Sequence, residues 1–288
     1  MPALQNKTYF NYGGQGPLPT PSLEAIKTSW LKIQRLGPFT NDVWPYISSE
    51  ISTTKELLGK ICGVHFNRIS LTENVTTGCV LPLWGLPLIH GDHILISDCE
   101  HPGVIAACKE LALRKGLQID IWPVQQMREG SNQQDRTDQE ILKSLESLIH
   151  PKTKLVVLSH LLWNTGQLMP IGAIADSLKE HPKKPFLLVD AAQSFGQIPI
   201  KDAASKVDIY AFTGHKWAFG PEGLGGVVLS ERVILESNPT IIGWRSLKTE
   251  KGIYQSISPQ FHLDGRRFEV ATSCIPLLAG LRVSLNLL

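Results

Sequence analysis

From about residue 90 onward, short β-branched or leucine-rich runs alternate with stretches of helical periodicity. The apolar runs predict strands at 94–97, 118–124, 155–160, 186–192, 207–213 and 225–230, and the stretches between them predict helices at 103–115, 138–149 and 171–179. A polar connection is predicted over 127–137, with Asp138 as the N-cap of the next helix. This alternation is typical of an α/β fold with a mostly parallel sheet flanked by helices. Such sheets bind ligands at the carboxyl ends of their strands, so the residues after each run are the first functional candidates.

The two ends of the chain have different patterns. Residues 9–20 are dense in glycine and proline and predict an ordered loop, followed by a helix over 21–35. After Thr272 the sequence predicts an apolar helix that stops without a polar tail. We therefore expect the chain to be a fragment of a longer protein.

Composition removes several classes of protein. The 288 residues include 28 Lys and Arg, 26 Asp and Glu, and 42% hydrophobic residues, which excludes a disordered or fibrous chain. No Lys/Arg-rich block occurs, so neither nucleic acid nor a membrane is an expected partner. Five cysteines without a C-x-x-C pair predict reduced thiols, and we expect no disulfides and no metal site. Without a signal peptide or a long apolar run, a cytoplasmic protein is expected.

The strongest local signal is the segment Thr-Gly-His-Lys at 213–216, which follows a predicted strand and precedes a glycine-rich turn. A lysine at the carboxyl end of a strand can become a desolvated, nucleophilic amine that forms a Schiff base. Taken alone, Lys216 is better interpreted as an ordinary surface lysine, because lysines in loops are abundant.

Asp190 makes the Schiff-base interpretation of Lys216 the stronger one. It ends the apolar run that begins at Phe186, and Gln193 follows three residues later. A carboxylate there is costly to bury unless a cation pairs with it. The protonated pyridine nitrogen of pyridoxal phosphate (PLP) would be such a cation. A helix cap or an ion-pair partner is the alternative, but it does not explain the nearby Gly-His-Lys.

A phosphate site is predicted where Thr76, Thr77 and Gly78 open a helix after a short strand. Backbone N–H groups and hydroxyls at a helix N-terminus bind anions, although an ordinary N-cap has the same pattern. His101, just after the strand at 94–97, offers an imidazole that could lie over an aromatic ring. A lone histidine is more often structural.

Together these segments resemble the class V aminotransferase family of PLP enzymes, which have the aspartate-aminotransferase fold. The family includes cysteine desulfurases, selenocysteine lyases, isopenicillin epimerases and kynureninases. The resemblance covers nearly the whole chain and rests on ordered motifs, namely YFNYGGQGPLP, NVTTG, EHPG, SHLLWNTGQLMPI, VDAAQS, TGHK with GPEGLGG, and RRFEVAT.

The resemblance implies roles for individual residues. Lys216 would hold the cofactor and act in catalysis, with Asp190 on the pyridine nitrogen. Gln193 would contact the phenolic oxygen, and His101 would stack on the ring and take part in catalysis.

The same resemblance implies the phosphate contacts. Thr76, Thr77 and His215 would bind the phosphate, and Thr272 would reach the phosphate of a neighbouring subunit. The family is dimeric with shared sites, which implies a homodimer here.

Substrate contacts and domains also follow from the resemblance. Candidate substrate contacts are Asn11, Gly14, Trp163 and Trp244, with Glu56 as a further candidate. Where desulfurases usually have S-N-x-x-G, this chain has Trp163 followed by Asn164, which leaves the asparagine contact unassigned. The implied domains are an N-terminal arm (1–20), a large PLP-binding domain (21–270) and the start of a helix (271–288) that leads to a small domain outside the chain.

Within the family, NVTTG and Gly243-Trp244-Arg245 resemble the cyanobacterial cysteine/cystine C–S lyases and the epimerases more than mainstream desulfurases. The expected activity is β-elimination of L-cystine or L-cysteine to pyruvate, ammonia and cysteine persulfide or sulfide. The sulfur would be passed on, for example to an iron–sulfur acceptor protein.

Alternatives remain open within and outside the family. A cysteine desulfurase or selenocysteine lyase would give alanine, and an epimerase would give neither product. A nicotinamide-dependent oxidoreductase shares the βαβ pattern, but no G-x-G-x-x-G lies between a strand and a helix. A non-catalytic PLP carrier is the remaining alternative.

Overall fold

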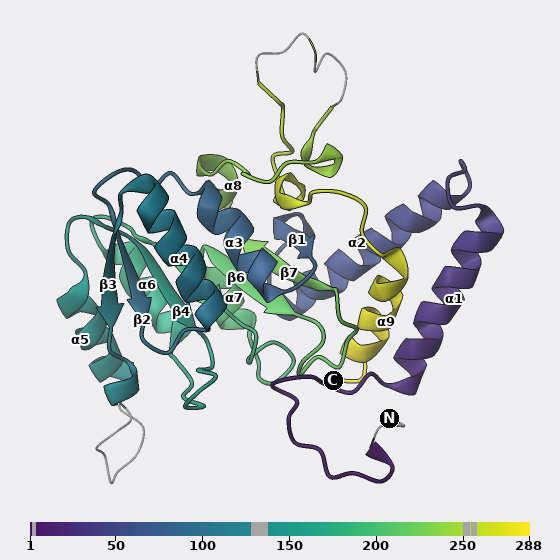
Figure 1. The fold of residues 1–288 in the computed structure, drawn as a ribbon, viewed down its shortest axis with the longest axis horizontal. Coiled ribbons are helices and arrows are strands. Elements are labelled where there is room, and N and C mark those ends of the chain that lie inside the picture. Colours follow the sequence, from purple (N-terminus) through teal and green to yellow (C-terminus); the bar gives the residue numbers. More distant parts are fainter. Residues whose placement is uncertain (2–3, 128–137, 250–253, 255–257) are drawn as a thin grey trace.

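The computed structural model describes residues 1, 4–127, 138–249, 254 and 258–288. In this part of the chain a seven-stranded sheet lies between layers of helices (Figure 1). The strands are β1 (Ile69–Thr72), β2 (His93–Ser97), β3 (Gln118–Trp122), β4 (Thr153–Ser159), β5 (Phe186–Asp190), β6 (Ile209–Thr213) and β7 (Gly225–Leu229). The helices are α1 (Thr20–Leu36), α2 (Val43–Cys62), α3 (Val75–Gly85), α4 (Pro102–Lys115), α5 (Asp138–Leu148), α6 (Ile171–Glu180), α7 (Lys201–Lys206), α8 (Glu231–Glu236) and α9 (Ile275–Leu285).

The strand order is β1-β7-β6-β5-β4-β2-β3. The neighbouring pairs from β6 to β3 are parallel, whereas β7 is antiparallel to both β6 and β1. The predicted α/β class with a mostly parallel sheet is thus confirmed. β7 can run back along β6 because residues 214–224, which join them, contain no helix to carry the chain across the sheet.

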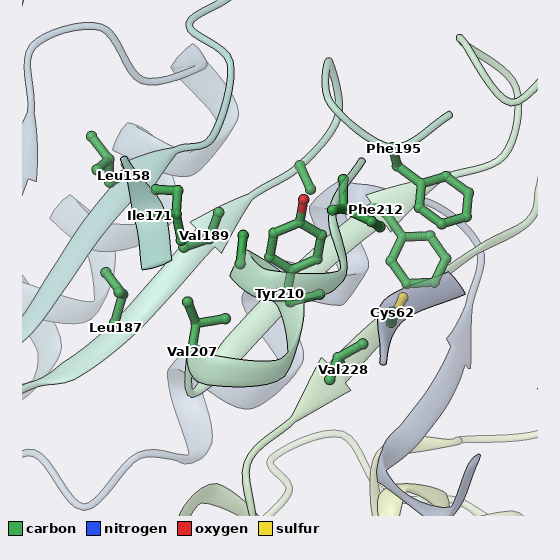
Figure 2. Packing of buried hydrophobic residues seen from close by; sticks show 14 of the residues in the cluster. Cys62, Leu158, Ile171, Leu187, Val189, Phe195, Val207, Tyr210, Phe212 and Val228 are labelled. Carbon is green, nitrogen blue, oxygen red and sulfur yellow. The ribbon is translucent and has the colours of Figure 1, made fainter. Parts of the chain in front are cut away.

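Helices cover both faces of the sheet, which explains why its central strands, such as β4, β5 and β6, are nearly continuous apolar runs instead of alternating ones. One face contributes Leu158, Leu187, Val189, Tyr210, Phe212 and Val228 to the larger core cluster, part of which is drawn in Figure 2. The other face contributes Ile94, Ile96, Leu155, Val157, Leu188 and Ile209 to a second cluster. Within the first cluster the rings of Phe195 and Phe212 stack at 4.1 Å.

The predicted helices are all present, with boundaries that differ by one or two residues. The predicted 103–115, 138–149 and 171–179 correspond to α4, α5 and α6, and the helix after the N-terminal loop is α1. Asp138 is the first helical residue of α5, whereas a position just before the helix was expected. The polar connection predicted over 127–137 lies outside the described residues beyond Met127. α2 was not predicted, since its serines and threonines and the early Pro45 give a weak helical pattern.

α1, α2 and α9 pack together at one side of the molecule (Figure 1, right). The hydroxyls of Ser22 and Ser284 lie 2.7 Å apart, and Arg282 donates to Glu50 at 2.8 Å. The predicted apolar helix after Thr272 is therefore present as α9, packed against the beginning of the chain. No helix in the described ranges combines the length and apolar character that crossing a membrane requires.

Candidate active site

The carboxyl ends of the parallel strands bring the predicted residues to one edge of the sheet. Ser159 pairs with Asp190, and Asp190 pairs with Ala211 two residues before the end of β6. The loops that follow β2, β4, β5 and β6 carry His101, Trp163, Gln193 and Lys216 in turn. Residues far apart in sequence therefore meet at the edge where sheets of this type bind ligands.

Asp190 is only 5% exposed. Its Oδ1 accepts a hydrogen bond from the Ala192 N–H at 2.8 Å, so it does cap the turn after β5. Burial raises its pKa, and the positive charges of Lys216 and His101 offset part of that effect. The carboxylate is thus incompletely compensated and suited to a further cationic partner.

Lys216 lies in a partly buried loop after β6. Desolvation lowers the pKa of its amine, and the charge of Asp190 opposes this shift. A lowered pKa increases the neutral fraction of the amine, which is the form that can act as a nucleophile or a base. Gly16 packs closely against this loop. Its N–H donates to the His215 carbonyl at 2.7 Å, and a side chain at position 16 would collide with the Lys216 carbonyl.

The predicted phosphate residues surround the N-terminus of α3. Asn74 is the N-cap, and its Oδ1 accepts from both the N–H (2.9 Å) and the hydroxyl (3.2 Å) of Thr77. Thr76 is exposed, and no described residue forms a hydrogen bond with its hydroxyl. Gly225 pairs with both Thr72 and Thr213, which places the start of α3 beside the end of β6.

His215 follows directly from that end of β6. Its Nδ1 lies 2.8 Å from the Thr213 hydroxyl. Burial lowers its pKa, and the charge of Lys216 lowers it further. The ring is therefore kept neutral, with Nδ1 bonded inside the protein and Nε2 left for a ligand.

Gln193 is held between two segments. Its Nε2 donates to the Gly13 carbonyl at 3.1 Å, and its Oε1 accepts from the Trp217 indole at 2.7 Å. The ring of Tyr12 lies 5.8 Å from that of Trp217. The N-terminal loop thus covers the site, and one amide hydrogen of Gln193 stays available for a ligand. Trp217 was not predicted to take part, although its place next to Lys216 was a signal.

His101 is the N-cap of α4, and its Nδ1 accepts from the Gly103 N–H at 3.1 Å. This bond fixes the orientation of the imidazole ring at the start of α4. The ring of Trp163 lies 6.3 Å away at 65°, and Trp163 is 53% exposed. The structure therefore brings these two predicted residues together.

Glu100 was part of a sequence motif but was given no role. It is 3% exposed and accepts hydrogen bonds from the hydroxyl of Ser97 (2.5 Å) and from the N–H and hydroxyl of Ser159 (2.8 Å each). Burial raises its pKa to about 7, with a contribution from the negative charge of Asp190. No sequence signal showed this coupling, because the two carboxylates meet only across β2, β4 and β5.

The predicted substrate residues are scattered. Asn11 accepts from the Gly14 N–H at 3.1 Å and thereby shapes the covering loop, and Trp244 is 48% exposed. Glu56 lies on the exposed face of α2 and lines a surface pocket with Lys201, away from the residues grouped around Lys216.

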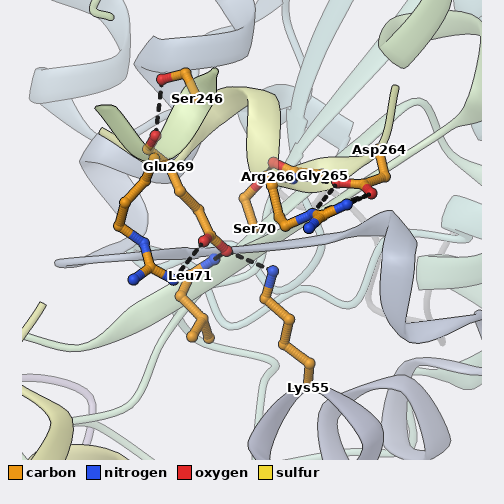
Figure 3. Close-up of polar contacts among 9 residues, drawn as sticks. Lys55, Ser70, Leu71, Ser246, Asp264, Gly265, Arg266 and Glu269 are labelled. Atoms are coloured by element: carbon orange, nitrogen blue, oxygen red, sulfur yellow. Dashed lines mark hydrogen bonds and ion pairs between the residues drawn. The ribbon is translucent and has the colours of Figure 1, made fainter. Parts of the chain in front are cut away.

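A buried cluster of charges anchors the segments around Trp244 and Thr272 (Figure 3). Glu269, which is 5% exposed, lies 2.5 Å from the Lys55 amine and 3.3 Å from Arg245. It also accepts from the Leu71 N–H at 3.2 Å. These contacts tie the segments before Thr272 and after Gly243 to α2 and β1. Thr272 itself is exposed.

Comparison with known proteins connects this geometry to chemistry. The profile of the family described as aminotransferase class-V matches residues 41–288. The cystine C–S lyase C-DES, solved in complex with its reaction product cysteine persulfide, is 43% identical over 99% of this chain and 73% of its own, with a TM-score of 0.89. A lysine-to-alanine variant of C-DES, with glycine covalently linked to its PLP cofactor, is 42% identical over 99% of this chain and 72% of its own (TM-score 0.88).

Curated relatives are more distant. A probable cysteine desulfurase of Pyrococcus abyssi is 24% identical over 98% of this chain and 68% of its own. An isopenicillin N epimerase of Amycolatopsis lactamdurans is 26% identical over 84% of this chain and 58% of its own. The chain spans between 27% and 68% of the lengths of the first curated relatives it matches. The chain belongs to the class V aminotransferase family.

Proposed function

We propose that the protein is a PLP-dependent C–S lyase that cleaves L-cystine by β-elimination to pyruvate, ammonia and cysteine persulfide. The observation that carries the proposal is the similarity to the cystine C–S lyase C-DES along nearly the whole chain. The chemistry of Asp190 and Lys216 supports it independently.

The residues at the strand ends fit PLP as a group. Asp190 is a buried carboxylate that lacks full charge compensation, as a protonated pyridine nitrogen requires. The exposed Thr76 hydroxyl, the N-terminus of α3 and the neutral His215 are suited to a phosphate. When bound, PLP withdraws electrons from the Cα of an amino acid and so makes the Cα proton acidic.

The proposed roles follow from these positions. Lys216 would hold the cofactor, and its amine, whose pKa is lowered, would take the Cα proton of the substrate. Asp190 would pair with the protonated pyridine nitrogen. Gln193 would donate its remaining amide hydrogen to the phenolic oxygen, and the ring of His101 would stack on the cofactor.

The overall reaction balances without a protein thiol. The Cα–H and Cβ–S bonds of one half of cystine break, and the sulfur leaves with the electron pair as cysteine persulfide. One water molecule then hydrolyses the remaining three-carbon fragment to pyruvate and ammonia. A persulfide has a lower pKa than a simple thiol and is therefore the better leaving group.

Desulfuration needs a nucleophilic thiolate, whereas the β-elimination described above needs no protein thiol. Cys62, Cys79, Cys99 and Cys108 are buried, and burial raises the pKa of each, to about 12 for Cys62 and about 11 for Cys99. None of these four thiols is suited to attack a substrate sulfur. Cys274 is the exposed one.

A cysteine desulfurase or selenocysteine lyase is the second candidate, because curated relatives include cysteine desulfurases. The two candidates differ in their products. The protein, in the longest form obtainable, is incubated with PLP and either L-cystine or L-cysteine, and pyruvate and alanine are measured. Pyruvate from cystine supports the lyase, whereas alanine from cysteine would replace it with a desulfurase. Lys216→Ala serves as the control, and an amino-acid epimerase would form neither product.

Further parts of the proposal concern assembly and location. A homodimer with shared sites is proposed, in which Thr272 reaches the phosphate of the neighbouring subunit. The large exposed aromatic residues Phe10 (82%) and Trp163 (53%) near the site support a partner surface. An iron–sulfur acceptor protein would receive the sulfur in the cytoplasm. The division into 1–20, 21–270 and 271–288 is kept as the proposed domain organisation.

A further inference from the structure

Three polar side chains meet at the edge of the sheet opposite the candidate active site. His93 is the first residue of β2, Asp120 lies in β3, and His150 lies between α5 and β4. His93 is at the amino end of β2, His150 precedes β4 and Asp120 is in the middle of β3, whereas Asp190 and Lys216 are at the carboxyl ends of their strands. The mechanism proposed above therefore makes no use of the group.

The donor atoms of these three side chains converge. His93 Nδ1 lies 2.8 Å from Asp120 Oδ2, His150 Nε2 lies 3.1 Å from the same oxygen, and the two nitrogens lie 3.1 Å apart. When two ligand atoms bind the same ion at about 2.1 Å, they are about 3.0 Å apart if the ligand–metal–ligand angle is about 90°. They are about 3.4 Å apart if that angle is tetrahedral. The observed triangle therefore matches three ligands on one face of a metal ion with little movement.

The backbone fixes the three ligands. Leu95 pairs with Asp120 in the parallel β2–β3 ladder, and the His93 N–H donates to the Lys152 carbonyl at 2.9 Å. The His150 N–H donates to the Thr153 hydroxyl at 3.1 Å. The two imidazole rings are almost perpendicular, at 88°. Two strands and one loop thus hold the donor atoms together before any ion binds.

The site is also open to an ion and its waters. The side chains of His93, Asp120 and His150 are 20%, 34% and 37% exposed. The Lys152 N–H donates to His150 Nδ1 at a long 3.3 Å, and metal binding at Nε2 would place the ring proton on Nδ1, so this long bond would be lost. One carboxylate partly neutralises a divalent charge, and water would complete the coordination.

We propose that His93, Asp120 and His150 form a binding site for a divalent first-row transition metal ion, with Zn²⁺ as the reference ion. Two imidazoles and one carboxylate are the ligand set that suits such ions. By binding all three side chains, the ion would link the edge strand β3 to β2 and to the loop before β4. This proposal departs from the expectation of no metal site, which was drawn from the cysteine pattern. The site is independent of the proposed lyase activity.

The test is a zinc titration of the PLP-loaded protein, without a histidine tag and in a Cys274→Ser background that removes the exposed thiol. A chromophoric chelator competes for the ion. We expect one Zn²⁺ per chain, with an affinity that falls by roughly 100-fold in Asp120→Asn. His181→Gln is the matched control, because His181 is a half-buried histidine outside the group and should leave binding unchanged.

A second readout locates the ion. Zinc should slow amide hydrogen exchange in β3 of the parent protein and not in Asp120→Asn. If Asp120→Asn does not fold, as judged by circular dichroism and by the absorption of bound PLP, His150→Gln replaces it. Absence of binding at tens of micromolar zinc, or equal binding in the parent and in the folded ligand variant, would overturn the proposal. Loss of lyase activity is not a readout, so failure of the proposed function leaves this test intact.

Discussion

Asp190 and Glu269 are equally buried, each 5% exposed, yet their surroundings shift their pKa values in opposite directions. Burial raises the pKa of Asp190, because the Ala192 N–H and the charges of Lys216 and His101 only partly compensate it. The pKa of Glu269 is lowered even though burial acts to raise it, because Lys55, Arg245 and a backbone N–H together outweigh burial. A buried carboxylate whose negative charge is fully compensated holds neighbouring segments of the chain together. A buried carboxylate whose charge is only partly compensated can still bind a cation.

The opposite shifts also predict opposite dependences of stability on pH. Native Asp190 holds its proton above the pKa of the unfolded chain, so its contribution makes the protein less stable as pH rises through that range. Glu269 contributes stability that is present above the unfolded pKa and is lost as pH falls through its lowered native pKa.

The largest expected effect is on catalysis and comes from Asp190→Asn. The amide keeps the shape but cannot stabilise a positive pyridine nitrogen, so pyruvate formation from cystine should fall by about 10²- to 10³-fold. The measurement is kcat for the PLP-saturated variant, with the urea midpoint as a control for folding. Activity within a few-fold of the parent would contradict the role of Asp190.

The matching change in the anchoring cluster is Glu269→Gln. It leaves the buried Lys55 and the half-buried Arg245 without their counter-charge, and the free energy of unfolding should fall by about 3 kcal/mol. Urea denaturation measures the loss, and the activity per folded molecule should change much less than in Asp190→Asn. If Glu269→Gln is as stable as the parent, the contrast between the two carboxylates fails.

Glu100→Gln sharpens the comparison through pH. The native pKa of Glu100 is about 7 and its unshifted value is 4.5, so the native state keeps a proton that the unfolded chain loses between these values. The raised pKa of Glu100 therefore does not change the free energy of unfolding below about pH 4.5. Above about pH 7 it lowers the free energy of unfolding by roughly 3 kcal/mol. Urea unfolding of both proteins at about pH 5 and pH 8 measures the change. If the free energies of unfolding of the parent and the variant change with pH in the same way, the raised pKa of Glu100 is refuted.

The smallest expected effect separates the two threonines of the phosphate motif. Thr76→Ala should weaken PLP binding about 5- to 10-fold, because its free hydroxyl is the one available to the phosphate. Thr77→Ala should mainly cost up to about 1 kcal/mol of stability, since its hydroxyl already bonds to Asn74 at 3.2 Å. PLP titrations and urea midpoints of both variants distinguish the roles, and equal PLP affinities would remove the distinction.

The sequence predicted the strands and most helices because apolar runs covered on both faces leave a strong local signal, as in 155–160 and 186–192. It missed α2, in which serine, threonine and Pro45 weaken the helical pattern and tertiary packing supplies the stability. It placed Lys216, Asp190 and Gln193 at strand ends, where the structure has them. It assigned Thr76 and Thr77 the same role, since only the cap by Asn74 distinguishes their hydroxyls.

The sequence alone determined the fold class and the identity of the residues at the carboxyl ends of the strands, because both follow from local periodicity and chain order. Only the tertiary structure decided which charges are compensated. The coupling of Glu100 to Asp190, the partners of Glu269 and the meeting of His93, Asp120 and His150 all join segments that are distant in the chain. Electrostatic energy depends on distance and burial in space, and neither quantity can be read from spacing along a sequence.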